Sequence, residues 1–144
     1  MAGGHLTDPP TSMTYSTVVS RESVRIAFLV AVLNRLEVLA GDIQNAYLNS
    51  PTSENNFFYA GPEWGVDEGC LVLIARALYG LKSSALQWRN HLSDVLCKKL
   101  GFTSSLADPG EKYYSYLLVY VDDILVIDIN PMKYMAMLQE SYTV

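Results

Sequence analysis

The sequence predicts an α+β fold built on antiparallel strands. Two long segments carry apolar residues at helical spacing, and the β-rich runs between them come in adjacent pairs instead of alternating singly with helices. The chain has 144 residues, half of them apolar, which is enough to bury one core. Residues 1–13 mix Gly, Pro and Thr and are expected to form a flexible arm, with one domain over residues 14–144.

The first helix is expected over Arg21–Leu36, where apolar side chains recur on one wide stripe. Ser20 stands directly before it and can cap its first turn. The short apolar run Glu37–Ile43 then predicts a core strand, which delivers Asp42 at its C-terminal end. A tight helical turn is expected at Ala46–Asn49.

Two further strands are expected at Asn56–Ala60 and Cys70–Ala75, and the Gly and Pro residues between them indicate a hairpin. The second helix is expected over Ser84–Leu100, ended by Gly101. Two β-rich runs follow with Asp122-Asp123 between them, the length of a tight hairpin turn: Tyr113–Val121 and Ile124–Ile129. A last helix is expected over Met132–Ser141, after Pro131.

The net charge of −5 is unevenly distributed. Residues 76–99 carry five basic side chains against Asp94 alone, whereas the segments on both sides are acidic. These five form a basic stripe: Arg76, Lys82, Arg89, Lys98 and Lys99. The stripe is compatible with a polyanion site beside acidic, cation-holding clusters, and equally with an ordinary solvated helix face.

Two cysteines without a CxxC spacing, Cys70 and Cys97, do not make a disulfide framework and favour a reducing intracellular setting, with a single bridge as the alternative. The longest apolar runs are far shorter than the ~20 residues of a membrane span, so no transmembrane helix is expected. The N-terminal residues do not have the pattern of a signal peptide.

The candidate chemistry lies in three carboxylates. Asp122 and Asp123 are adjacent at the tip of an apolar hairpin, where they repel each other unless cations balance them; the alternative is that they are ordinary turn aspartates. Asp42 ends another apolar strand. Three carboxylates on neighbouring strands can hold two Mg²⁺ ions ~3.5–4 Å apart, an arrangement suited to phosphoryl transfer.

Four blocks together resemble the reverse transcriptase of copia-type long-terminal-repeat retrotransposons. They occur in the order of that family, at residues 14–20 (TYSTVVS), 39–49 (LAGDIQNAYLN), 76–84 (RALYGLKSS) and 120–125 (YVDDIL). The resemblance runs from about residue 14 to the C-terminus. It implies a polymerase palm-like antiparallel sheet with helices packed on one face, with the fingers truncated and the thumb absent.

The resemblance further implies an RNA-directed DNA polymerase that transfers nucleotides to a primer 3′-OH. Asp42, Asp122 and Asp123 match its catalytic and metal-binding residues, with Asp42 and Asp122 as the closer ligands of two Mg²⁺ or Mn²⁺ ions. Tyr47 matches the aromatic gate beneath the nucleotide sugar, the alternative being a buried structural tyrosine. The backbone N–H groups of five residues are expected to face the triphosphate: Ile43, Gln44, Asn45, Ala46 and Tyr47.

Lys82, Ser83 and Arg89 match the region that contacts template, primer or phosphate, although many relatives have Gln in place of Ser83. Lys82 and Arg89 can equally be solvated helix charges. Trp88 is expected in the core, with a base-stacking platform as the alternative.

The implied partners are an RNA template, a DNA primer, dNTPs, and the fingers, thumb and RNase H segments of a Pol polyprotein. The implied location is inside the cell, in a cytoplasmic virus-like particle or the nucleus, and no membrane partner is expected. The alternative is a catalytically inactive remnant that at most binds nucleic acid or a partner. In either case, the isolated segment is expected to be weak or inactive as an enzyme.

Overall fold

The computed structural model describes residues 14, 16, 18–52, 54–103 and 115–144. These residues form two compact units, one built mainly on Tyr47–His91 and the other on Thr17–Ala46 together with Leu92–Val144. The expected arm at residues 1–13 lies outside the described residues. Across the described ranges, no helix is both long and apolar enough to cross a membrane.

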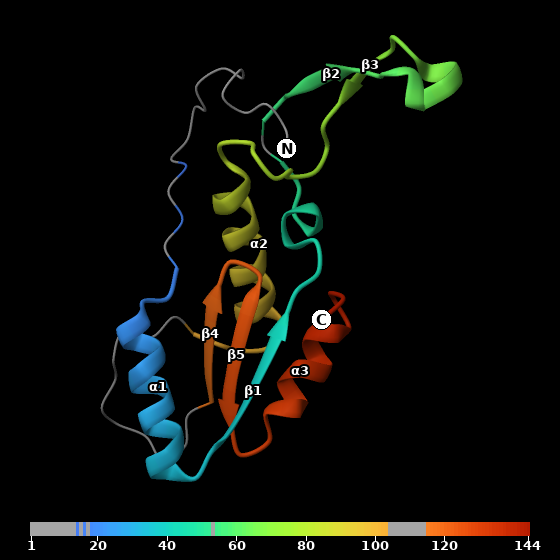
Figure 1. Ribbon diagram of the computed structural model, residues 1–144. Coiled ribbons are helices and arrows are strands. Elements are labelled where there is room, and N and C mark those ends of the chain that lie inside the picture. The colour runs from blue at the N-terminus through green and yellow to red at the C-terminus, as the bar shows by residue number, and fades with distance from the viewer. Residues whose placement is uncertain (1–13, 15, 17, 53, 104–114) are drawn as a thin grey trace. The chain divides into compact units, whose positions relative to one another are not determined.

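The second unit contains an antiparallel sheet of three strands in the order β1 (Glu37–Asp42), β5 (Asp123–Asp128) and β4 (Tyr116–Tyr120) (Figure 1). The central strand β5 is the most buried of the three, because both of its faces are covered. Ile124, Val126 and Ile127 are at most 2% exposed. The antiparallel sheet and the α+β class agree with the prediction.

Helix α1 (Arg21–Asn34) packs on one face of this sheet through Ala27 and Ala31, which contact Ile127. Its start was correctly placed: the Ser20 hydroxyl accepts a hydrogen bond from the Ser23 N–H at 3.1 Å, which satisfies one of the unpaired amides of the first turn. The helix ends two residues earlier than expected, because Arg35 adopts a left-handed conformation (φ 55°).

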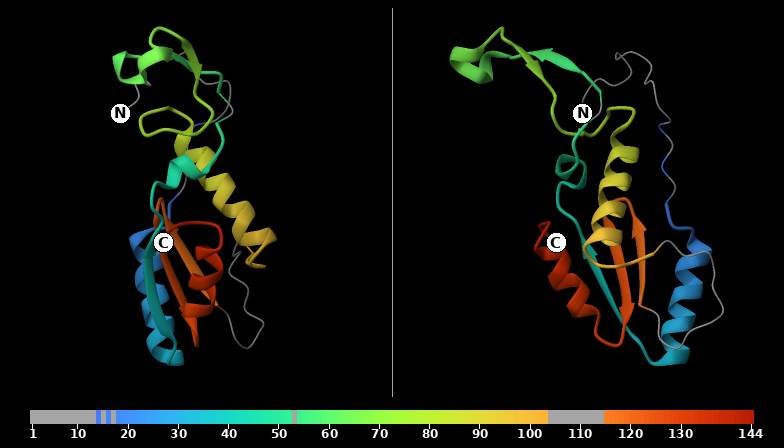
Figure 2. Two further views of the ribbon diagram at one scale, coloured as in Figure 1. Left: turned by 90° about the vertical axis from the view of Figure 1, so that its right-hand side faces the viewer. Right: turned by 180° about the vertical axis from the view of Figure 1, so that it is seen from behind.

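Helix α3 (Pro131–Gln139) covers the opposite face. A side chain at Gly41 would point toward α3, where its Cβ would lie 3.0 Å from Met135 Cε and 2.8 Å from Val144 Cγ1. Gly41 pairs with Ile124, whereas α1 covers the face of Leu125 and Ile127, and successive residues of a strand alternate between faces. The expectation that the helices pack on one face is therefore wrong for α1 and α3, which cover opposite faces of the sheet (Figure 2).

The first unit contains the predicted hairpin, with shorter strands than expected. Strands β2 (Phe57–Tyr59) and β3 (Leu71–Leu73) pair antiparallel, and the 3-10 segment η3 (Pro62–Asp67) connects them (Figure 1). The expected turn at Ala46–Asn49 is the 3-10 helix η2. Helix α2 (Ser84–Lys98) begins at the predicted residue; it belongs to this unit up to His91 and to the second unit from Leu92 on. It buries Trp88 and Leu92, each 2% exposed, which confirms Trp88 as a core residue.

Candidate functional site

The end of the sheet where β1 stops and β4 turns into β5, called the tip here, carries all three predicted carboxylates. The turn consists of Val121 and Asp122, and Tyr120 pairs with Asp123. The turn therefore lies one residue earlier than predicted. Its position places Asp123 in the ladder as the first residue of β5 and leaves Asp122 in the turn.

Asp42 and Asp123 face each other directly across the β1–β5 ladder. The neighbouring pair is hydrogen-bonded, because the Ile43 N–H donates to the Asp122 carbonyl at 2.9 Å. Bonded and non-bonded pairs alternate in an antiparallel ladder, so Asp42 and Asp123 form a non-bonded pair, the type in which opposite side chains lie closer, with Cα atoms about 4.5 Å apart. Two negative charges are thus held on one face at the close spacing of the ladder.

Both of these carboxylates are exposed, and Asp122 is half-buried. In the described residues, the side chains of Asp42 and Asp123 make no hydrogen bond or ion pair. No group of three or more His, Cys, Asp or Glu side chains in the same residues has the arrangement of a metal site. The sheet register therefore pairs Asp42 with Asp123, and Asp122 does not complete a three-carboxylate cluster with them.

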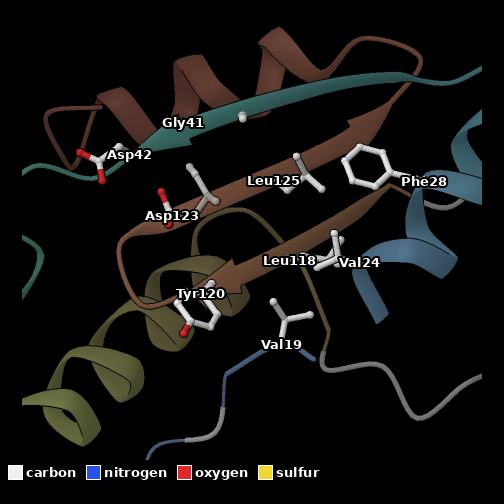
Figure 3. A pocket seen from close by; sticks show the side chains of 11 residues that line it. Val19, Val24, Phe28, Gly41, Asp42, Leu118, Tyr120, Asp123 and Leu125 are labelled. Carbon is white, nitrogen blue, oxygen red and sulfur yellow. The ribbon is translucent and has the colours of Figure 1, made fainter. Parts of the chain in front are cut away.

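An open groove of about 460 Å³ borders this pair in the second unit (Figure 3). Asp42 and Asp123 contribute to its lining, and most of the remaining wall is apolar side chains from α1, the segment before it and the sheet, including Val19, Phe28, Leu118 and Leu125. The Val19 N–H donates to the Val119 carbonyl at 3.3 Å, which holds the segment before α1 beside β4. The sequence pattern predicted a wide buried stripe on α1, and this is wrong for most of the stripe: Ala27 and Ala31 are buried, whereas Ile26, Leu29, Val32 and Leu33 are 57–76% exposed. The pattern also missed Val19 and Phe28 as groove residues, because their positions depend on long-range packing.

The turn contains a conformation that the sequence did not reveal. Val121 has φ 60°, and Asp122 is not among the residues with positive φ. Positive φ at only the first central residue is the pattern of a type II′ turn, which favours glycine there. A β-branched residue in this region is strained. The sequence signal for this strain is a two-residue turn with Val121, and not Asp122, as its first central residue.

The expected triphosphate-binding amides require a correction at two of five positions. The Ile43 N–H is used by the Asp122 carbonyl, and the Gln44 N–H donates to the Thr143 carbonyl at 2.9 Å, so neither faces a triphosphate. Ile43 and Ala46 are buried, and Asn45 is left-handed with φ 52°. Tyr47 belongs to the other unit, where its ring lies 4.4 Å from that of Tyr79, centroid to centroid.

The predicted nucleic-acid contacts differ in their accessibility. Arg89 is exposed on α2 and Lys82 is half-buried, whereas Ser83 is 1% exposed. The Ser83 carbonyl accepts a hydrogen bond from the Gln87 N–H at 2.9 Å, and its buried hydroxyl has no hydrogen-bond partner among the described atoms. In this structure, Ser83 therefore belongs to the start of α2 and does not present its side chain to a template. Further along the helix, Lys98 pairs with Asp94 at 2.9 Å.

Behind the tip, the C-terminal segment contributes one perturbed group. Tyr142 is buried, and burial raises the pKa of its phenol to about 12, because the charged phenolate is disfavoured away from water. Its neighbour Thr143 accepts the hydrogen bond from Gln44, so this segment supports the end of β1. The sequence did not identify this role.

Comparison with known proteins identifies one family. Residues 5–141 match the family described as reverse transcriptase (RNA-dependent DNA polymerase). The chain is 32% identical over 127 residues to the retrovirus-related Pol polyprotein from transposon RE1 of Arabidopsis thaliana, which covers 82% of this chain. It is 31% identical over 122 residues to the Pol polyprotein from transposon RE2 of the same plant, covering 78% of this chain. The corresponding protein from transposon TNT 1-94 of Nicotiana tabacum is 28% identical over 122 residues, again 78% of this chain.

The matched region is a small part of these relatives. It spans 8% of the RE1 and RE2 polyproteins and 9% of the TNT 1-94 polyprotein. No solved structure matches the chain.

Proposed function

The chain belongs to the reverse transcriptase (RNA-dependent DNA polymerase) family, as a domain of copia-type retrotransposon Pol polyproteins, and from this we propose that it is the palm core that adds nucleotides to a primer 3′-OH on an RNA template. The observation that carries the proposal is the pairing of Asp42 with Asp123 at the ends of two neighbouring strands, beside the turn that contains Asp122. Asp42 and Asp123 come from separate sequence blocks, and only the sheet register brings them to the same end of the sheet.

The donor chemistry fits a divalent cation. Carboxylate oxygens are the ligands that Mg²⁺ and Mn²⁺ prefer, and two exposed carboxylates on adjacent strands are accessible to a hydrated ion. Asp42 and Asp123 would hold the metal; Asp123 replaces Asp122 in the expected pair of closer ligands, because the register opposes Asp42 to Asp123. When bound, two such ions would supply Lewis-acid activation of the primer hydroxyl and neutralise charge on the triphosphate.

The protein's own contribution is to fix these carboxylates in place. The Ile43–Asp122 hydrogen bond ties the turn to the end of β1, and the Gln44–Thr143 bond ties β1 to the C-terminal segment. Charged groups held in a fixed geometry stabilise a transition state without reorganising during the reaction. We further propose Tyr47 as the residue beneath the sugar, and Lys82 and Arg89 as phosphate contacts for the RNA template, the DNA primer and the incoming dNTP.

Two observations favour the alternative of a nucleic-acid-binding remnant without catalysis. The described residues hold no three-carboxylate cluster, and the amides of Ile43 and Gln44 are already engaged. In that case, the basic stripe would bind nucleic acid and the carboxylates would contribute little. The two functions predict different behaviour toward metal.

Metal titration separates them. We expect the chain to bind Mn²⁺ weakly in calorimetry, and Asp42→Asn and Asp123→Asn each to remove that binding. Asp94→Asn is the matched control, because Asp94 is an exposed carboxylate on α2 that pairs only with Lys98 in the described residues. Identical isotherms for all four proteins would contradict the site.

Activity is tested on the chain joined to the fingers and thumb segments of a relative. Incorporation of dNTPs on an RNA-templated DNA primer is expected to fall at least about a hundredfold in Asp42→Asn and Asp123→Asn. Each substitution removes a preorganised carboxylate charge from beside the reacting phosphate. The Asp94→Asn graft should retain the parent rate. A folded graft that binds RNA without incorporating dNTPs would favour the remnant.

A further inference from the structure

Tyr47 and Tyr79 form an aromatic pair within the first unit. Their ring centroids are 4.4 Å apart and their ring planes are tilted by 44°. This spacing is at the short end of the ~4.5–7 Å range usual for aromatic pairs, so the two rings are in direct van der Waals contact. The contact joins two separate sequence blocks, residues 39–49 and 76–84, and Tyr79 had no expected role in the second of them.

The backbone of Tyr47 is fixed by Ser50. The N–H and the hydroxyl of Ser50 each donate to the Tyr47 carbonyl at 3.0 Å. Ser50 is fully buried, so water does not compete for these two bonds. The Ser50 carbonyl in turn accepts from the Ala77 N–H at 3.0 Å, which ties the end of η2 to the segment that leads into Tyr79.

The backbone of Tyr79 is fixed as well, because this residue is the second of a tight turn that begins at Leu78. The Leu81 N–H donates to the Leu78 carbonyl at 3.2 Å, and Gly80 has φ 98°, the conformation that a type II turn requires at its third residue. The buried Ser84 hydroxyl also donates to the Leu78 carbonyl, at 2.6 Å. None of these bonds uses the Tyr79 side chain, so a substitution there leaves the frame in place.

The ring contact adds a constraint that the backbone does not supply. A tyrosine on a fixed backbone can still change its rotamer about χ1. Two rings with centroids 4.4 Å apart leave no room between them, so the Tyr79 ring blocks movement of the Tyr47 ring toward its side.

We propose that Tyr79 is a positioning residue for sugar selection, whose ring holds the Tyr47 ring where it excludes a 2′-hydroxyl on the incoming nucleotide. This inference rests on the proposed function, which gives Tyr47 the place beneath the sugar. A ring in that place discriminates between sugars only while it cannot turn away from the added hydroxyl, and packing against a neighbouring side chain locks a rotamer in this way. Tyr79 therefore acts through Tyr47 and needs no contact of its own with the nucleotide.

The contact itself is tested in the 144-residue chain by fluorine NMR after labelling with 3-fluorotyrosine. The Tyr47 signal is identified as the one that Tyr47→Phe removes. We expect Tyr79→Leu to shift this signal, because the adjacent ring is lost, and Tyr79→Phe to leave it near its parent position. Phe58→Leu is the matched control, since Phe58 forms an aromatic pair with Trp64 in the same unit, with centroids 5.8 Å apart. A Tyr47 signal that Tyr79→Leu does not move would contradict the contact.

Sugar selection is measured on the chain joined to the fingers and thumb segments of a relative, as the ratio of kcat/KM for a dNTP to that for the matching rNTP. Tyr79→Leu is expected to lower this ratio about tenfold through better use of the rNTP, because small displacements of a positioned group have effects of at least this size. Tyr79→Phe and Phe58→Leu should keep the parent ratio. General damage to the fold lowers both rates together and leaves the ratio unchanged. Tyr79→Met replaces Tyr79→Leu if the leucine variant does not fold.

The double variant Tyr47→Ala/Tyr79→Leu shows whether Tyr79 acts through Tyr47. Tyr47→Ala alone should lower the ratio at least as far as Tyr79→Leu, and the second substitution should lower it no further, since residues in one contact are not additive. An unchanged ratio in Tyr79→Leu, or an equal loss in Tyr79→Phe, would overturn the inference while Tyr47 keeps its role. An unchanged ratio in Tyr47→Ala, or a parent graft that incorporates no nucleotide, would contradict the proposed function, and sugar selection by Tyr79 would fall with it.

Discussion

Asp42 faces Asp123 at the tip of the three-stranded sheet, and Glu37 faces Asp128 at the other end, called the base, so the β1–β5 ladder begins and ends on an acidic pair. At the base, Asp128 uses both carboxylate oxygens. One accepts from the Asn130 N–H at 2.7 Å, and the other accepts from the Ser115 hydroxyl, which is also 2.8 Å from the Tyr134 hydroxyl. At the tip, neither carboxylate has such a partner in the part of the chain that the structure describes.

The two ends differ in whether hydrogen bonds compensate the opposed negative charges. Directly opposed like charges destabilise a ladder, and hydrogen bonds to one of them offset that cost at the base. The tip keeps its repulsion and adds a strained turn at Val121. Unrelieved charge and backbone strain at the same place are typical of a site whose ligand supplies the missing interactions.

The largest expected effect is at the base. Asp128→Ala should lower the free energy of unfolding by about 2 kcal/mol, because it removes an acceptor that serves the Asn130 amide and the Ser115 hydroxyl. Urea denaturation measures the change. Glu37→Ala, the other half of the pair, should stay within about 0.5 kcal/mol of the parent, since Glu37 is exposed and makes no side-chain hydrogen bond in the described residues. Equal losses in the two variants would show that the base is not held by Asp128.

The next effect concerns the segment behind the tip and depends on pH. The pKa of Tyr142 is about 12 in the folded chain against the ordinary tyrosine value of 10.0, so both states are protonated below about pH 10. Above that pH, the unfolded chain loses its proton first, and the free energy of unfolding should fall by about 1–2 kcal/mol as pH rises toward 12. Tyr142→Phe should remove this part of the pH dependence. A parent and variant with parallel profiles up to about pH 12 would mean that Tyr142 is not buried in solution.

A smaller and opposite effect is expected in the turn. Val121→Gly should raise the free energy of unfolding by about 1 kcal/mol, because glycine adopts positive φ without the strain of a β-branched side chain. The matched control is Val119→Gly in regular β4, which should be destabilising. Destabilisation by both substitutions would show that the side-chain contacts of Val121 outweigh its backbone strain.

Local signals in the sequence predicted the elements well and their assembly poorly. The Ser20 cap and the apolar stripe of α1 depend on residues within a few turns of one another, so the start of the helix was correct. The face that α3 covers depends on the contact of Gly41 with Met135, almost a hundred residues away, and was predicted wrongly. The three carboxylates could be named from their blocks, whereas the pairing of Asp42 with Asp123 depends on a turn position that composition does not fix.

Asp123→Asn should change the free energy of unfolding least, and its response to Mg²⁺ distinguishes the tip of the sheet from the base. In metal-free buffer, Asp123→Asn should raise the free energy of unfolding by about 0.5 kcal/mol, because it relieves repulsion with Asp42 across a non-bonded pair. The parent should then gain stability when Mg²⁺ is added, since a ligand that binds only the folded state shifts unfolding, and Asp123→Asn should not. Glu37→Gln relieves the corresponding pair at the base and should leave the Mg²⁺ response of the parent intact. Thermal unfolding with and without Mg²⁺ measures all three proteins, and a Mg²⁺ response that survives in Asp123→Asn but is lost in Glu37→Gln would place the cation at the wrong end of the sheet.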